Sequence, residues 1–237
     1  MAESVRALTL MAALLTGCSQ AATPSPAPAE ARPEVPTMVP PKVTLVAPSA
    51  SDSTVRPVSA GDLGASWRPG CPIGPERLRL VEIDYHGFDG EKHRGELVVN
   101  EDLVDDVRSI FAKLLSIGYP IEKMRTPEHY PGAEDELSME DNNTSAFNCR
   151  GIPGSADWSQ HAYGRAIDID PLINPSISAS GKLEPTTAGK YVDRARTDPG
   201  MLHDGDPVVR LFAEHGWAWG GKWRDPKDYQ HFERPSS

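Results

Sequence analysis

Proline is the residue type that most restricts where this chain can fold. Nine of its 23 prolines fall between positions 24 and 57, in a segment that is otherwise rich in Ala, Ser and Thr. A segment of this composition buries too little apolar surface to offset the entropy lost on ordering, and frequent proline stiffens it into an extended spacer. Only residues 58–237 then remain to build a core, and a segment of that length predicts a single domain.

The first residues have the pattern of an export signal. The apolar run at 7–15 is too short to span a bilayer, and a short segment with one basic residue, Arg6, precedes it. The run ends in Leu-Thr-Gly-Cys at 15–18, which resembles the lipobox of bacterial lipoprotein signal peptides. The resemblance implies cleavage before Cys18 and a lipid on its sulfur. The alternative is an ordinary secretory signal with a chance cysteine.

These features predict three regions: a signal peptide at 1–17, a lipid-anchored linker at 18–57 and the folded domain at 58–237. We expect the protein to be exported and attached to the outer face of the cell membrane by its lipid alone. The formal net charge is -10 and no basic cluster is present, which argues against nucleic acid as a partner.

Two cysteines remain once Cys18 carries lipid. In an exported protein, an isolated pair such as Cys71 and Cys149 predicts a disulfide. The bond would close a loop of 149 - 71 = 78 positions and tie the N-terminal edge of the domain to the segment that precedes residue 150.

The folded region mixes strand and helix patterns. Two strand-like segments at 78–85 and 93–100 flank a Gly-Phe-Asp-Gly turn, which predicts a hairpin. Apolar residues spaced by three and four at 103–115 predict a helix that Asn100 caps and Gly118 closes. A second helix is expected after Asp206-Pro207 and is ended by Gly216.

Short strands are expected at 120–124, 165–170, 217–219 and 229–233, and a long loop at 174–205. In the 165–170 strand, Ile167 and Ile169 share one face, so Asp168 on the other face can point into a cleft. Strands interleaved with two helices and joined by hairpins indicate the α+β class.

Three side chains form a candidate metal site. His161, Asp168 and His231 offer two imidazoles and one carboxylate, a ligand set that suits zinc. Three protein ligands leave one position of a tetrahedral ion open, as in catalytic sites. Gly164 allows a tight turn between the first two ligands. Each residue alone reads more simply as a surface histidine or a turn residue; together they predict a site.

The motifs that carry these residues resemble a known family. Ser159-x-His161-x-x-Gly164-x-Ala166-x-Asp168, then Gly-Trp-x-Trp-Gly-Gly-x-Trp at 216–223 and Asp228-Tyr229-x-His231-Phe232, are similar to the M15 zinc peptidases. This group contains D-alanyl-D-alanine carboxypeptidases and L-alanyl-D-glutamate endopeptidases. The resemblance implies a small antiparallel sheet flanked by helices, a hedgehog/DD-peptidase-like fold. It also implies one Zn²⁺ held by His161, Asp168 and His231.

The same resemblance assigns roles to residues near the ligands. Asp228 matches the general base that activates a zinc-bound water, although a carboxylate that only orients a histidine is the alternative. Arg150 falls where the family places a basic residue near the substrate; a surface ion pair is the alternative. Ser145 and Asn143 are weaker candidates for lining the cleft. Ser159 and Glu233 are expected to support the ligands, and Trp217 and Trp219 to pack in the core.

The function expected from these residues is hydrolysis of amide bonds in peptidoglycan stem peptides by a monomer. Whether the bond is L-Ala-D-Glu or the terminal D-Ala-D-Ala stays open, and so does the physiological role. A catalytically inactive wall-binding module on the same fold is the alternative, but it would need a lost base, and Asp228 is present. A non-haem iron oxygenase also uses two His and one carboxylate, but with a closer spacing than 168 - 161 = 7.

Overall fold

The computed structural model describes residues 53–235. The predicted signal peptide, Cys18 and nearly all of the predicted linker lie outside these residues. Strand β1 (Val55–Pro57) pairs antiparallel with β2, so a strand lies within the last positions of the segment that the sequence assigns to the linker.

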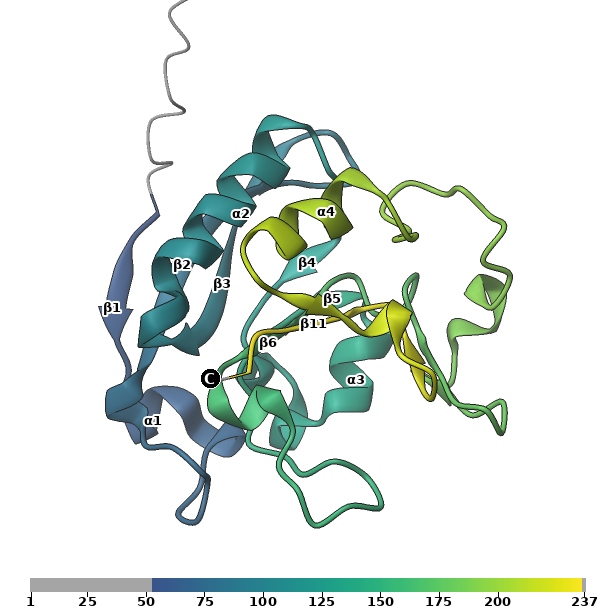
Figure 1. Ribbon diagram of the computed structural model, residues 1–237. Coiled ribbons are helices and arrows are strands. Elements are labelled where there is room, and N and C mark those ends of the chain that lie inside the picture. Colours follow the sequence, from purple (N-terminus) through teal and green to yellow (C-terminus); the bar gives the residue numbers. More distant parts are fainter. Residues whose placement is uncertain (1–52, 236–237) are drawn as a thin grey trace, which may run out of the picture. The chain divides into compact units, whose positions relative to one another are not determined.

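The N-terminal half is a three-stranded antiparallel sheet, β1-β2-β3, covered by one long helix (Figure 1). Strands β2 (Leu78–His86) and β3 (Lys92–Asn100) form the predicted hairpin, with Leu78 opposite Asn100 and His86 opposite Lys92. Helix α2 (Val104–Ser116) follows a 3-10 turn in which the Asn100 side chain accepts a hydrogen bond from the Asp102 amide. Its buried face, with Val107, Ile110, Phe111 and Leu114, joins the main core.

A second, smaller apolar cluster lies beneath the start of the domain. Helix α1 (Ala60–Leu63) is capped by Ser59, and Leu63 packs in this cluster with Phe147 and Cys149. The predicted disulfide between Cys71 and Cys149 is present, with the two Cα atoms 5.9 Å apart. It attaches the segment before β2 to the residues that precede Arg150, as expected.

The C-terminal half contains three small sheets. Strands β4 (Lys123–Met124) and β5 (Asn143–Thr144) pair in parallel, and helix α3 (Asp135–Glu140) lies between them in the chain. A central antiparallel sheet has the order β6-β11-β9, made of β6 (Ala166–Asp168), β11 (His231–Glu233) and β9 (Ala218–Trp219). Helix α4 (Pro207–Glu214) begins at the expected Asp206-Pro207 and packs Phe212 against Phe232 of β11.

The third sheet lies where the sequence predicts a long loop at 174–205. Strands β7 (Ser176–Ile177) and β8 (Leu183–Glu184) form a hairpin, and β7 also pairs with β10 (Lys227–Asp228). The prediction of an unstructured loop is wrong at these positions, because strands of two residues leave no periodic pattern in a sequence. Part of the segment lines the largest cavity described below, through Ser176 and Glu184.

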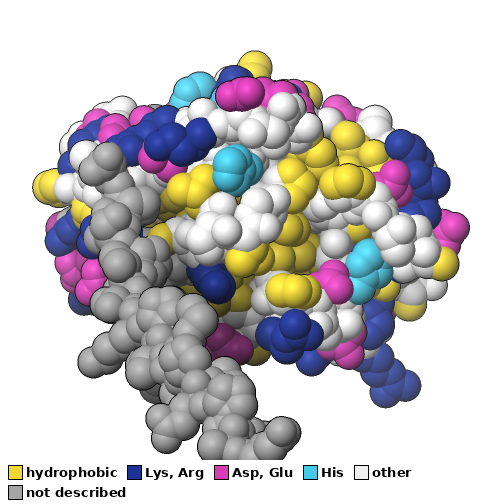
Figure 2. All heavy atoms as spheres, turned by 90° about the horizontal axis from the view of Figure 1, so that it is seen from above, with side chains coloured by type: hydrophobic (Ala, Val, Ile, Leu, Met, Phe, Trp, Pro, Cys, Tyr) yellow, Lys and Arg dark blue, Asp and Glu magenta, His cyan; other side chains and the backbone are white. Residues whose placement is uncertain are grey.

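The described residues therefore have the mixed helix-and-sheet organisation of the α+β class, with small antiparallel sheets, as predicted. Short 3-10 helices connect the elements at Gly64–Ser66, Pro75–Arg77, Glu101–Leu103, Pro127–His129, Pro131–Ala133, Gln160–Tyr163, Ala188–Tyr191 and Gly220–Lys222. Among residues 53–235, no helix has the length and apolar character needed to cross a membrane. On the face shown in Figure 2, acidic and basic side chains are interspersed around a central group of hydrophobic ones.

Candidate metal centre

Three separate elements carry the candidate ligands. His161 lies in the 3-10 helix Gln160–Tyr163, Asp168 ends β6, and His231 begins β11. Strand β11 pairs antiparallel with β6 so that His231 lies directly opposite Asp168. The strand pairing therefore brings together two side chains that are 63 positions apart in the chain.

The turn between His161 and Asp168 depends on two local features. The Ser159 hydroxyl accepts a hydrogen bond from the His161 amide at 3.3 Å, which caps the 3-10 helix. Gly164 ends this helix with a positive φ of 65°, and a Cβ there would lie 2.7 Å from the backbone nitrogen of Asn100. Only glycine fits both the conformation and the space. The tight turn predicted from Gly164 is thus present.

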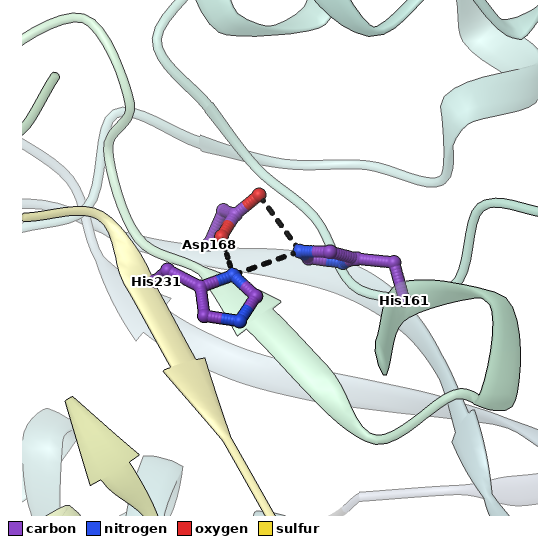
Figure 3. A group of neighbouring side chains, drawn as sticks. All are labelled: His161, Asp168 and His231. Carbon is purple, nitrogen blue, oxygen red and sulfur yellow. Dashed lines mark hydrogen bonds and ion pairs between the residues drawn. The ribbon is translucent and has the colours of Figure 1, made fainter. Parts of the chain in front are cut away.

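The three side chains converge on one point (Figure 3). The Nε2 atom of His161 is 3.1 Å from Nδ1 of His231 and 3.0 Å from Oδ2 of Asp168. Oδ1 of Asp168 is 3.0 Å from Nδ1 of His231. Two ligands of a tetrahedral zinc with bonds of about 2.0–2.1 Å lie about 3.3 Å apart, so this spacing is close to that of a metal site.

Partners outside the cluster set the protonation of both rings. Nδ1 of His161 lies 2.5 Å from the Ala146 carbonyl oxygen, which can only accept, so this nitrogen donates and Nε2 keeps its lone pair. Nε2 of His231 lies 3.2 Å from the Glu233 carboxylate, as expected for a residue that orients this ring. Two lone pairs and a carboxylate then face one another, and this arrangement needs a cation or a proton between them.

The pKa values of Asp168 and His231 also favour a positive charge in this cluster. Burial favours the neutral acid at Asp168, but the neighbouring His161 and His231 rings dominate and lower its pKa. Burial opposes charge on His231, yet its contacts with Asp168 and Glu233 raise the pKa of this ring to about 10. A proton therefore occupies the cluster when no metal does, and a metal that binds must displace it.

A cavity of about 680 Å³ opens over the cluster. His161, Asp168 and His231 lie in its lining, together with carboxylates from several elements. Among the described residues of this lining, Arg150 is the only Lys or Arg. The lining also contains the neutral residues Trp158, Ser176 and Trp223 and the acidic residues Asp135, Glu136, Glu184, Asp225, Asp228 and Glu233. Their negative charge favours a bound cation.

Asp228 lies in the same cavity, at the end of β10. Its Oδ1 atom is buried and has no hydrogen-bond partner among the described residues. Burial, reinforced by the nearby Asp168, raises the pKa of Asp228 to about 7 although His231 and Arg150 act in the opposite direction. A carboxyl group with this pKa can accept or release a proton near neutral pH.

Gly220 lies close to both Asp228 and His231. A Cβ at Gly220 would lie 2.7 Å from the Asp228 carbonyl oxygen and 3.3 Å from the His231 Cβ. The Gly-Gly pair at 220–221 directly follows β9, at the point where the chain lies against these two site residues. A residue without a side chain is therefore needed in this part of the Gly-Trp-x-Trp-Gly-Gly motif.

Arg150 lies at the edge of the cluster, whereas Ser145 lies behind it. One terminal nitrogen of Arg150 is 2.9 Å from Asp135 Oδ2 and 3.7 Å from Asp168 Oδ2, and its buried Nε has no partner among the described residues. Ser145 exchanges two backbone hydrogen bonds with Asp168, at 2.9 and 3.1 Å, and does not line the cavity. A contact between Ser145 and a substrate stays a prediction.

The remaining sequence candidates have structural roles. The Asn143 side chain is fully buried and bonds to the Arg125 backbone and to Ser138. Trp217 and Trp219 belong to the main core, as predicted. Trp158, Trp223 and Asp135 also line the cavity. Trp223 ends the motif at 216–223 but has no predicted role, and nothing local to Trp158 or Asp135 signals their position. The Trp223 ring centre is 5.1 Å from that of His231.

Comparison with known proteins adds one finding. No curated protein and no solved structure matches the chain. The family model described as D-alanyl-D-alanine carboxypeptidase, an M15 peptidase model, matches residues 153–234. This segment contains His161, Asp168, His231 and Asp228. The match confirms the predicted resemblance: it supports an M15-family peptidase and suggests a hydrolase that acts on peptidoglycan.

Proposed function

We propose that this protein is a zinc metallopeptidase that hydrolyses amide bonds in peptidoglycan stem peptides. The observation that carries the proposal is the convergence of Nε2 of His161, Asp168 and Nδ1 of His231 in a cavity that also contains Asp228. The family match over 153–234 supports the reaction class. Within the proposal, the fold is hedgehog/DD-peptidase-like and the protein acts as an exported monomer anchored by a lipid on Cys18.

The metal, when bound by His161, Asp168 and His231, would acidify water and polarise the scissile carbonyl group. The carboxylate of Asp228 accepts the proton of the attacking water, and the resulting acid returns it to the leaving amine. Its pKa of about 7 suits both transfers at neutral pH. Arg150, held by Asp135, faces the same space with an unpaired Nε and can bind a substrate carboxylate or oxyanion.

The bond that is cut is either L-Ala-D-Glu or the terminal D-Ala-D-Ala bond. The matched family is described by the second activity, while the Asp228 and Gly-Trp-x-Trp-Gly-Gly motifs favour the first. Defined stem peptides distinguish the two, because carboxypeptidase action removes one terminal alanine whereas endopeptidase action separates the first residue from the rest of the stem.

The direct test is mass spectrometry of such peptides after incubation with the zinc-loaded protein, with and without a chelator. We expect cleavage that the chelator abolishes. Asp228→Asn should lower kcat by about 10²–10⁴-fold while one zinc stays bound. Asp204→Asn is the matched control, since this carboxylate is largely exposed and lies outside the cavity. Undiminished activity of Asp228→Asn would refute the role of the base.

An unchanged peptide with the zinc-loaded wild type would overturn the peptidase proposal. Binding of that protein to purified peptidoglycan would then support the wall-binding module on the same fold.

A further inference from the structure

One partly buried cation near the strand that carries Asp228 has no acidic partner among the described residues. Arg194 lies in the segment between β8 and α4, and among residues 53–235 no carboxylate is within ion-pair distance of it. Burial lowers the pKa of its guanidinium. Moving a guanidinium group out of water costs free energy unless its N–H groups and its charge are compensated. The contacts of Arg194 therefore show which parts of the chain it connects.

Those contacts are backbone oxygens and one amide. Arg194 donates to the carbonyl oxygens of Ile173 at 2.9 Å, Leu202 at 2.8 Å and Tyr191 at 3.3 Å. It also donates to Oδ1 of Asn174 at 3.2 Å. Ile173 and Asn174 lie 21 and 20 positions from Arg194, whereas Tyr191 and Leu202 lie 3 and 8 positions from it. The guanidinium therefore crosslinks these segments beside a second cavity, which Arg194 and Tyr229 line, and not in the lining of the cavity over the cluster.

Asn174 extends this crosslink to the strand that carries Asp168. Its side chain is fully buried and donates to the carbonyl oxygens of Ile169, at 3.2 Å, and Gly200, at 2.9 Å. Ile169 directly follows Asp168, and its amide bonds to the Gln230 carbonyl at 3.0 Å, next to His231. The network thus reaches the backbone beside two candidate ligands.

The planar guanidinium group of Arg194 lies against the residue that follows Asp228. Its guanidinium carbon is 4.2 Å from the ring centre of Tyr229, the residue that follows Asp228. The Tyr229 backbone is fixed on both sides, since its amide donates to the Pro175 carbonyl at 3.3 Å and its carbonyl accepts from Trp219 Nε1 at 2.8 Å. Ser176, next to Pro175, pairs with Asp228 itself.

The Asp228 carboxyl group has a side-chain hydrogen bond with Gln230, but its buried Oδ1 lacks a partner among the described residues, so its direction also depends on the strand that carries it. We propose that Arg194 is a positioning residue: by joining Ile173, Asn174 and Tyr229, it fixes the β7–β10 strand pair and so aims Asp228 at the candidate metal cluster. This inference rests on the proposed role of Asp228 as the general base.

The test compares Arg194→Met with Arg196→Met in the full-length, zinc-loaded protein. Arg196 lies two residues away in the same segment, but its guanidinium forms an ion pair with Asp198. We expect Arg194→Met to lower kcat about tenfold or more, because small displacements of a catalytic group are costly, with KM changed less than about twofold and one zinc retained. Arg194→Lys should lie between Arg194→Met and the wild type, since an ammonium cannot reach all four acceptors. Arg196→Met should match the wild type.

Equal kcat values for Arg194→Met and Arg196→Met would overturn the proposal. A loss of bound zinc in Arg194→Met that fully accounts for its lower kcat would overturn it as well, since Arg194 would then support the ligands rather than Asp228. If Arg194→Met fails to fold, Tyr229→Leu and Tyr229→Phe replace it. Only the leucine removes the stacking face, so equal kcat values in this pair count against the proposal.

Hydrogen exchange separates this inference from the proposed function. Arg194→Met should raise the exchange rate of the amides at 176–177 and 227–229, while those of β2 and β3 and those of Arg196→Met stay unchanged. The exchange measurement does not depend on activity: if the wild type cleaves no peptide, the peptidase proposal fails, and raised exchange then shows only that Arg194 holds the β7–β10 pair. Unchanged exchange at 176–177 and 227–229 would rule out the positioning role.

Discussion

At the scale of single residues, the candidate site is defined by lone pairs that face one another. The Ala146 carbonyl fixes the proton on Nδ1 of His161, and Glu233 fixes the proton on Nε2 of His231. The sequence could predict the candidate ligand cluster and the nearby Asp228 and Glu233, because short motifs carry all of these residues. It could not identify Asp135 as the partner of Arg150 or Trp223 as the neighbour of His231, because those contacts depend on tertiary packing.

A pH dependence of metal binding follows from these residues. Contacts with Asp168 and Glu233 raise the pKa of His231 to about 10, so near neutral pH the metal-free cluster holds a proton that zinc must displace. The apparent zinc affinity should therefore weaken as the pH falls from 8 to 6, by up to about tenfold per pH unit for each proton released. Competition with a chelator of known affinity at each pH measures this slope. An affinity that stays constant over this range would argue against a protonated metal-free cluster.

At the scale of elements, two strand pairings form the site. The β6–β11 register places Asp168 opposite His231, and the β10–β7 pairing places Asp228 beside Ser176. The β2–β3 hairpin and helix α2 could be predicted from the sequence because their apolar residues repeat over many positions. The β10-β7-β8 sheet could not, because its strands have two residues each and are held by partners from distant segments.

Gly220 offers a test of how tightly these elements must pack. In Gly220→Ala, the new methyl group would lie 2.7 Å from the Asp228 carbonyl oxygen, so the chain around Asp228 must shift. We expect a loss of about 1–3 kcal/mol in the free energy of unfolding, as for other overpacked sites, and a clear drop in kcat. Gly189→Ala is the control, because a Cβ there meets no atom within 4 Å. Denaturant unfolding and steady-state kinetics measure both effects, and similar values for the two variants would argue against close packing at Gly220.

At the scale of the whole domain, the disulfide joins the N-terminal segment to the wall of the cavity. Cys149 precedes Arg150, its amide donates to the Ser66 carbonyl at 2.9 Å, and its carbonyl accepts from Arg68 at 2.6 Å. The pairing could be predicted from cysteine counting and the predicted export signal alone. The path of the chain around it could not, since Ser66 and Arg68 lie in a segment without a regular apolar pattern.

Removing this bond should destabilise the domain substantially. The bond closes a loop with a sequence separation of 78, so the chain-entropy estimate is about 4 kcal/mol. For the double variant Cys71→Ser/Cys149→Ser, we expect Tm to fall by about 10 °C. Differential scanning calorimetry of wild type and variant provides the comparison, with the reduced wild type expected to resemble the variant. A Tm within about 2 °C of the oxidised wild type would show that the bond adds little.

The proposed chemistry depends above all on one assignment, that Nε2 of His161, the carboxylate of Asp168 and Nδ1 of His231 bind one zinc ion. Anomalous diffraction at the zinc absorption edge, from crystals of the zinc-loaded protein, locates such an ion without reference to activity. We expect a single strong peak within about 2.0–2.2 Å of these three groups, with Asp228 facing it from the cavity. A cluster without a peak, or a zinc ion bound elsewhere in the domain, would show that the assignment is wrong.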